Sequence, residues 1–202
     1  MPRFLLLLSL LFPALSWGGQ FERFFDGLTG FTADFEQTVI DAQDQTIQQS
    51  AGEVAILRPD RFRWDYVRPY RQLLLGDGQT LWSYDADLEQ ATAADQQAAL
   101  AGTPAVLLAS DRPVGALFEV VQREEIDGGE LVVLAARDPD SPWRRVLLAF
   151  SGGMLTGMEL GDGFGQTTRI HFRNPRRNPP LDPARFRFDP PPGTDVIRAP
   201  AP

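Results

Sequence analysis

The sequence of 202 residues contains no cysteine, no lysine and only one histidine, His171. Without cysteine no disulfide can form, so the chain tolerates an oxidising compartment without exploiting it. Zinc sites need clusters of histidine, cysteine and carboxylate ligands, and no such cluster is present. A serine–histidine–aspartate triad could use only His171, and no serine stands in a nucleophile-elbow sequence. The composition therefore predicts neither an enzyme nor a cofactor or metal site, and His171 is interpreted as a partly exposed strand residue.

Positive charge is also scarce, because 19 arginines stand against 27 aspartates and glutamates, for a formal net charge of -8. Phosphate neutralisation supplies most of the non-specific affinity for nucleic acids, so an acidic chain is disfavoured as a general nucleic-acid binder. Hydrophobic residues make up 43% of the chain and charged residues 23%, which indicates a folded protein. The length fits one ordinary domain.

The N-terminus has the pattern of a cleavable export signal. Arg3 gives a short positive region, residues 4–15 form an apolar run, and small residues follow at Ser16, Gly18 and Gly19. Such a run is too short to span a bilayer as an ordinary helix. We predict that residues 1–18 are a signal peptide cleaved between residues 16 and 19, and that residues 19–202 form a single domain. An uncleaved anchor or core helix is the alternative.

From Phe31 onward, apolar and polar residues alternate in the manner of half-buried strands. The pair Asp77-Gly78 suits the type I′ turn of a hairpin, and glycine-rich turns follow near residues 128, 152 and 163. The spacing predicts roughly ten to twelve strands in a sandwich or barrel. Strands are expected to begin at Phe31 and Phe118 and to occupy residues 52–57, 61–66, 72–76, 79–84, 88–92, 131–136, 145–150, 154–160, 166–172 and 186–188.

Short helical segments interrupt this pattern. Phe21, Phe24, Phe25 and Leu28 fall at i, i+3, i+4 and i+7, which predicts an amphipathic helix at the start of the mature chain. Thr103-Pro104 is a suitable N-cap and N1 pair for a helix over residues 105–108. Residues 113–117 are expected to form a further helical turn.

The stretch over residues 57–66 places three arginines among three aromatics, a mixture that single-stranded nucleic-acid binders also use. Strand alternation separates the two kinds, because Phe62, Trp64 and Tyr66 point one way while Arg61 and Arg63 point the other. The aromatic face is therefore read as an interior wall and the arginine face as solvated. A bulge in the strand would reverse this assignment.

Two further motifs favour turns over functional sites. Residues 161–165 have the glycines of a phosphate-binding loop but lack the lysine and helix that follow such a loop. Asp85 and Asp87 come after a predicted strand, where aspartate favours turns. A secreted enzyme using Asp85 with Glu89 is the enzymatic alternative.

Large apolar residues recur on single faces of the predicted strands. A sheet of about eleven strands encloses more volume than its own side chains readily fill. An inserted helix or a ligand could take the surplus volume. The spacing alone favours a filled core over a ligand cavity. The candidate interior residues are Phe62, Trp64, Tyr66, Trp82, Tyr84, Val146, Leu148, Phe150, Met154 and Met158.

Six motifs follow one another along nearly the whole mature chain. They are Phe31-x-Ala33-x-Phe35-x-Gln37, Arg58-Pro59-x-x-Phe62-x-Trp64, the stretch from Gly76 to Tyr84, Leu88-Glu89-Gln90-Ala91-Thr92, Thr103-Pro104 and Phe186-x-Phe188-x-Pro190-Pro191-x-Gly193. In this order and behind an export signal they are specific, and the sequence resembles the LolA family of periplasmic lipoprotein carriers.

The resemblance implies a mainly β fold, an unclosed antiparallel β-barrel of about eleven strands with short α-helices as a lid over a hydrophobic cavity. It implies that Arg58 hydrogen-bonds the lid and helps to hold the empty carrier closed. The cavity for acyl chains would add Phe35, Val106, Leu107 and Leu108 to the interior residues named above.

The resemblance also implies a function and partners. A periplasmic carrier of a Gram-negative bacterium would receive acylated lipoproteins from an ATP-driven inner-membrane transporter and pass them to an outer-membrane receptor. That receptor is itself a lipoprotein, so the missing cysteine favours carrier over receptor. We expect a monomer without cofactor or nucleic-acid partner. An envelope sensor of lipids or glycolipids with the same half-barrel is the alternative function.

Overall fold

The computed structural model describes residues 18–97, 103 and 105–199, together with the backbone but not the side chain of Val106. The predicted signal peptide therefore lies almost wholly outside the described residues. Helices are short: α1 (Gln20–Phe25), α3 (Val106–Ala109), α4 (Val114–Leu117) and the 3₁₀ helix η1 (Pro183–Phe186). None of the helices in the described ranges is long and apolar enough to cross a membrane.

Twelve strands form one sheet in the order β12-β6-β5-β4-β3-β2-β1-β11-β10-β9-β8-β7. Every neighbouring pair is antiparallel except β12 and β6, which are parallel. The strands are β1 (Gly30–Ile40), β2 (Thr46–Leu57), β3 (Arg61–Arg68), β4 (Gln72–Asp77), β5 (Thr80–Asp85), β6 (Gln90–Asp95), β7 (Phe118–Ile126), β8 (Gly129–Ala136), β9 (Trp143–Ser151), β10 (Met154–Asp162), β11 (Thr167–Arg177) and β12 (Asp195–Arg198).

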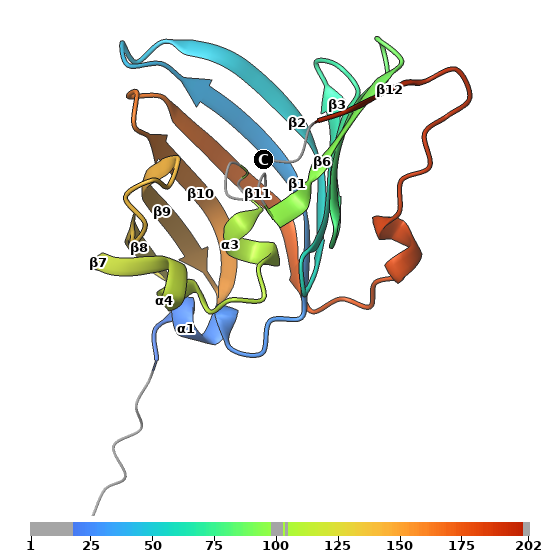
Figure 1. The fold of residues 1–202 in the computed structure, drawn as a ribbon. Coiled ribbons are helices and arrows are strands. Elements are labelled where there is room, and N and C mark those ends of the chain that lie inside the picture. The colour runs from blue at the N-terminus through green and yellow to red at the C-terminus, as the bar shows by residue number, and fades with distance from the viewer. Residues whose placement is uncertain (1–17, 98–102, 104, 200–202) are drawn as a thin grey trace, which may run out of the picture.

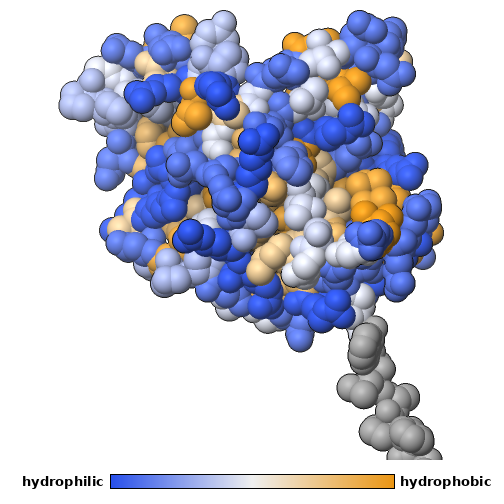
Figure 2. Space-filling model, turned by 180° about the vertical axis from the view of Figure 1, so that it is seen from behind, coloured by the Kyte–Doolittle hydropathy of each residue, from blue (hydrophilic) through white to orange (hydrophobic). Residues whose placement is uncertain are grey.

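The sheet curls without closing, so β12 and β7 remain at its two ends (Figure 1). This confirms the predicted mainly β, unclosed antiparallel architecture. Helices α1, α3 and α4 lie on the concave side, while the C-terminal segment runs outside the sheet past β3 and β6 (Figure 1). The face opposite to that view is mainly hydrophilic, with separate hydrophobic groups (Figure 2).

The predicted strand over residues 186–188 is wrong. Pro183–Phe186 form the 3₁₀ helix η1, and the Asp182 carboxylate caps it by accepting a hydrogen bond from the Ala184 N–H at 2.9 Å. Proline near the start of the helix supplies a suitable φ. The residues after η1 pair with no strand until β12, which runs beside β6. Phe186 is buried at the end of η1, and the Phe188 ring packs on Trp82 and Tyr84 of β5 instead of extending the sheet.

The helical predictions differ in their boundaries. The first helix ends at Phe25, three residues before the end of its apolar stripe. The helix predicted over residues 105–108 is α3, which begins at Val106 with Ala105 at its N-cap. Pro104, half of the predicted cap, lies outside the described residues. The helical turn predicted over residues 113–117 is α4.

Candidate functional site

The concave face of the sheet is covered by one hydrophobic core cluster that also includes side chains of α1, α3 and α4. The sheet supplies residues from β1, β2, β3, β5, β7, β8, β9, β10 and β11. Strand pairing explains the shared face, since Phe35 lies opposite Phe172 and Ile56 opposite Phe62. Side chains of the helices and of the sheet thus pack together on the concave face.

Aromatic rings line the inner wall at the centre of the sheet. The Phe35 ring centroid lies 5.3 Å from that of Trp64 and 5.1 Å from that of Tyr66. Phe172 is 6.5 Å from Trp64 and 5.4 Å from Phe31, both centroid to centroid. Rings at such distances and tilts pack favourably. The structure therefore brings Phe35, Phe62, Trp64 and Tyr66 together on one wall, although Tyr66 is only partly buried against the cluster.

The lid side chains complete this cluster. Leu107 and Leu108 of α3 are buried within it, and so are Val146, Leu148 and Phe150 of β9. Met158 of β10 lies there as well. The side chain of Val106, also predicted to line the interior, lies outside the described residues.

Met154 does not share the face of Met158, contrary to the prediction. The pairing of β10 with β9 shifts between Leu155 and Gly157, which inserts one extra residue. A bulge of this kind reverses the alternation of side chains. Leu155 is consequently buried in the core cluster opposite Phe150, whereas Met154 pairs with Ser151 and stays outside the cluster.

Trp82 and Tyr84 also lie away from the predicted interior. In β5 it is Leu81 that joins the core cluster, so the neighbouring Trp82 points to the outer face. There the Phe188 ring centroid lies 5.4 Å from Trp82 and 5.3 Å from Tyr84. The C-terminal segment thus gives these aromatics an apolar partner on the convex side, which strand alternation could not reveal.

Arg58 links the sheet to the lid. It follows β2, and its Nε donates a hydrogen bond to the carbonyl oxygen of Leu108 at 2.8 Å. Its Nη2 donates to the carbonyl oxygen of Leu107 at 3.4 Å. These are carbonyls of α3, a four-residue helix whose last carbonyls lack partners within the helix. Burial lowers the pKa of Arg58, and the charges of Asp111 and Asp60 oppose that shift.

Asp60 is a second connection to the lid, which the sequence interpretation missed. Its backbone N–H donates to the Ala109 carbonyl at 2.8 Å, and its own carbonyl accepts from Gln96 Nε2 at 2.6 Å. Burial and the charge of Asp111 raise the pKa of the Asp60 carboxyl, while the Asp111 backbone N–H and Arg58 lower it. The turn after β2 therefore holds three successive residues of the lid. The family resemblance predicted the contact of Arg58 with the lid, whereas nothing in the sequence indicated the partners of Asp60.

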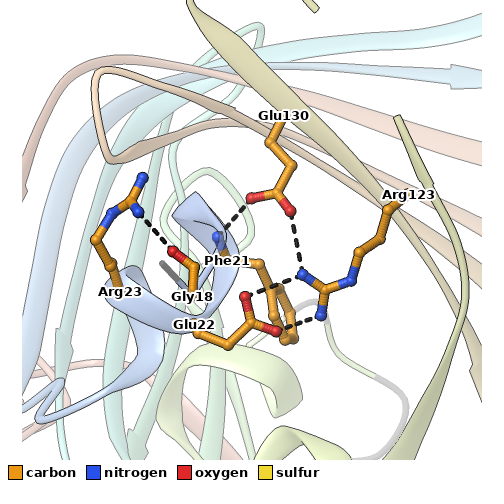
Figure 3. A network of polar contacts seen from close by, with 6 residues as sticks. All are labelled: Gly18, Phe21, Glu22, Arg23, Arg123 and Glu130. Carbon is orange, nitrogen blue, oxygen red and sulfur yellow. Dashed lines mark hydrogen bonds and ion pairs between the residues drawn. The ribbon is translucent and has the colours of Figure 1, made fainter. Parts of the chain in front are cut away.

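Helix α1 is fastened at the other end of the concave face (Figure 3). Glu130 accepts a hydrogen bond from the Phe21 backbone N–H at 2.9 Å and pairs with Arg123 at 3.2 Å. Arg123 also pairs with Glu22 and stands 5.5 Å from the centroid of the Phe21 ring. Arg123 lowers the pKa of Glu22 through a hydrogen bond. The network joins α1 to β7 and β8.

The other motifs weighed from the sequence have structural roles. Asp85 accepts hydrogen bonds from the N–H groups of Asp87 and Leu88, as in a turn. Asp162 does the same for Phe164 and Gln166. Within the described ranges, no three histidine or acidic side chains are grouped so that they could hold a metal ion.

Residues 26–189 match the family described as outer membrane lipoprotein carrier protein LolA. The match covers most of the chain. This chain belongs to the LolA family.

Close relatives support the LolA assignment. The chain is 38% identical over 207 residues to an outer-membrane lipoprotein carrier protein of Methylococcus capsulatus, a match that covers 98% of this chain and 99% of the relative. It is 39% identical to a carrier of Dechloromonas aromatica, covering 93% and 91%. The carrier of Neisseria meningitidis serogroup B is 36% identical, with coverage of 88% and 84%.

Solved structures share the fold of this LolA member at low sequence identity. An uncharacterised conserved protein from Thermus thermophilus superimposes with a TM-score of 0.56 at 14% identity, covering 89% of this chain and 97% of that one. This similarity concerns the fold alone.

Proposed function

We propose that this protein carries acylated lipoproteins through the periplasm and releases them at the outer membrane. The observation that carries the proposal is membership of the LolA family, with relatives named as outer-membrane lipoprotein carriers along nearly the full chain. The geometry agrees, since a concave apolar wall lies beneath helices that polar contacts hold in place. No observation favours the sensing alternative.

Acyl chains take the place of lid side chains in this proposal. Burying a methylene group is worth about 0.8 kcal/mol, so full burial of a long chain would bind too tightly for release. Opening the lid separates Leu107 and Leu108 from the core and breaks the hydrogen bonds of Arg58. That cost is subtracted from the affinity for cargo, which leaves the complex reversible without a nucleotide.

The proposed cavity wall consists of the predicted residues on the concave face. Leu155 is added, and Met154, Trp82 and Tyr84 are removed, because of the faces on which they lie. Val106 is left out because its side chain lies outside the described residues. The wall is then Phe35, Phe62, Trp64, Tyr66, Leu107, Leu108, Val146, Leu148, Phe150, Leu155 and Met158.

Cargo would come from an ATP-driven transporter of the inner membrane and leave to a receptor of the outer membrane. The protein would reach the periplasm through the signal peptide of residues 1–18. Mass spectrometry of the exported protein should therefore give a new N-terminus between residues 16 and 19. An intact N-terminus beginning at Met1 would refute the cleavage.

Co-purification tests the function. The tagged protein isolated from periplasm should carry lipoproteins whose acyl chains are identified by mass spectrometry. Depletion of the protein should leave lipoproteins in the inner membrane. Normal localisation after depletion, together with no bound acylated cargo, would refute the proposal.

A further inference from the structure

The concave wall contains polar groups that its packing does not require. Among the described residues, three buried side-chain polar atoms have no hydrogen-bond partner: Ser50 Oγ, Trp64 Nε1 and Trp143 Nε1. Trp64 and Ser50 are only 1% and 7% exposed and belong to the adjacent strands β3 and β2. Trp143 stands at the start of β9, in the other half of the sheet.

Strand register places Ser50 on the same inner face as Trp64. Ser50 lies opposite Gln37, and Gln37 lies two residues beyond Phe35, whose ring contacts Trp64. The Tyr66 hydroxyl donates to Gln37 Oε1 at 3.3 Å. Burial raises the pKa of Tyr66 to about 12, so this hydroxyl stays protonated at neutral pH. The Tyr66 hydroxyl, Gln37 and Ser50 thus form a polar border to the aromatic wall, next to Phe35.

An indole N–H can only donate a hydrogen bond, and leaving it buried without an acceptor is unfavourable. Phenylalanine would fill an apolar wall without this cost, as it does at Phe35 and Phe62. A ligand that carries an oxygen acceptor into the wall removes the cost. The first carbon of any acyl chain is such a group, because it is the carbonyl carbon of an ester or amide.

We propose that Trp64 donates a hydrogen bond from its indole N–H to the carbonyl oxygen of a bound fatty acyl group, with the Ser50 hydroxyl as a second donor. The inference rests on the proposed function. It adds that the wall recognises the carbonyl end of the acyl chain as well as its hydrocarbon part. The carrier would then distinguish acyl chains from alkyl chains of equal size.

The test compares two synthetic lipopeptides with the same peptide and the same number of chain carbons. One carries two ester-linked acyl chains and the other two ether-linked alkyl chains. The protein of residues 19–202 should bind the ester form roughly threefold to tenfold more tightly, the range expected for one net hydrogen bond. Isothermal titration measures both affinities.

The variant Trp64→Phe should lose most of the preference for the ester form, because it keeps an aromatic ring and loses the main donor. Ser50→Ala should reduce the preference. The matched control is Trp82→Phe, which removes an indole N–H from the outer face, where the ring packs on Phe188. This control should retain the full preference. Circular dichroism checks that each variant is folded.

The outcomes separate the inference from the function. Equal binding of both lipopeptides by the unaltered protein would overturn the inference and leave lipoprotein carriage standing. A preference that survives in both Trp64→Phe and Ser50→Ala would overturn it too, and Ser50→Ala keeps the test decisive if Trp64→Phe does not fold. Binding of neither lipopeptide would refute the proposed function itself.

Discussion

At the scale of single residues, Arg58 has the largest expected effect on the lid. Its guanidinium donates hydrogen bonds to the carbonyls of Leu108 and Leu107, which lie 50 and 49 residues further along the chain. The head group is half-buried there, so its hydrogen bonds are protected from solvent. A hydrogen bond to a charged group contributes more than one between neutral groups. We therefore expect this one side chain to bias the lid toward its closed state.

Arg58→Leu is expected to loosen the lid. Both hydrogen bonds to α3 are lost, which should favour the open state by about 1.5–3 kcal/mol. Amide hydrogen exchange across residues 105–111 should accelerate, and cargo transfer to the receptor should change. Arg61→Leu is the control, because Arg61 begins β3, whereas among the described residues it is Arg58 whose side chain binds the carbonyls of α3. Unchanged exchange in Arg58→Leu would remove the latch role.

Gly52 is the residue whose size matters most to the sheet. A Cβ atom there would stand 1.8 Å from the Asp65 carbonyl oxygen of the neighbouring strand, far inside contact distance. Gly52→Ala must therefore separate β2 from β3 next to their register shift. We expect a loss of about 2–4 kcal/mol in the free energy of unfolding, measured by urea denaturation.

The comparison for this prediction is Gly115→Ala. Gly115 lies in α4, where an added Cβ would meet nothing within 4 Å. Alanine favours the helix, so this variant should be neutral or stabilised by up to about 1 kcal/mol. Similar losses in both variants would contradict the steric explanation.

At the scale of elements, α1 depends on its surroundings. It has only six residues, and helices this short are unstable alone. Phe21 and Phe24 bury one side of it, and the network of Glu22, Arg123 and Glu130 holds the other (Figure 3). Glu130 is 5% exposed, and it forms an ion pair with Arg123.

Arg123→Gln is expected to destabilise the protein and to free α1. The change leaves the buried Glu130 carboxylate without its counter-charge, at a cost of about 1–3 kcal/mol. Limited proteolysis with trypsin should then cleave at Arg23 sooner. Arg169→Gln breaks an exposed pair with Glu159, so it should cost less than about 1 kcal/mol. Equal effects of the two changes would refute the special role of Arg123.

The same network predicts a dependence on pH. Because Arg123 lowers the pKa of Glu22 below 4.5 in the folded state, the stabilisation is complete above that value. It is lost as the pH falls from 4.5 through the lowered folded pKa. Glu22 is largely exposed, so the effect is under about 1 kcal/mol. Glu22→Gln should flatten this part of the stability curve measured from pH 6 to pH 3.

At the scale of the whole molecule, an unclosed sheet leaves two edge strands that could pair with other chains. At one end β12 covers β6. At the other end β7 is bulged near Val121 and has charged residues at Arg123, Glu124 and Glu125. Bulges and charges discourage edge pairing, which supports the expected monomer.

Deletion of residues 194–202 tests the protection of β6. The backbone N–H and C=O groups of β6 that pair with β12 would be exposed. Sedimentation velocity should then show dimers or larger species at concentrations where the full protein is monomeric. The double substitution Val196→Thr and Ile197→Thr keeps the strand and should stay monomeric. A monomeric deletion variant would show that β12 has no protective role.

Much of the fold could be predicted because alternation and turn residues are local signals. The hairpin at Asp77-Gly78 and the turns near residues 128, 152 and 163 needed no knowledge of the rest of the chain. The face of Met154 could not be predicted, since a one-residue bulge depends on pairing with another strand. The role of Phe188 depended on where the C-terminal segment crosses the sheet.

The sequence by itself determined the family, the strand-rich architecture and the aromatic stripe of β3, because these follow from the order and period of nearby residues. The tertiary structure alone decided the faces of Met154, Trp82 and Tyr84 and the contacts of Asp60 with the lid. Arg58, Asp60 and α3 are distant in sequence, and only the curvature of the sheet brings them into hydrogen-bonding distance. The unpartnered N–H of Trp64 became evident for the same reason, since burial depends on every strand around it.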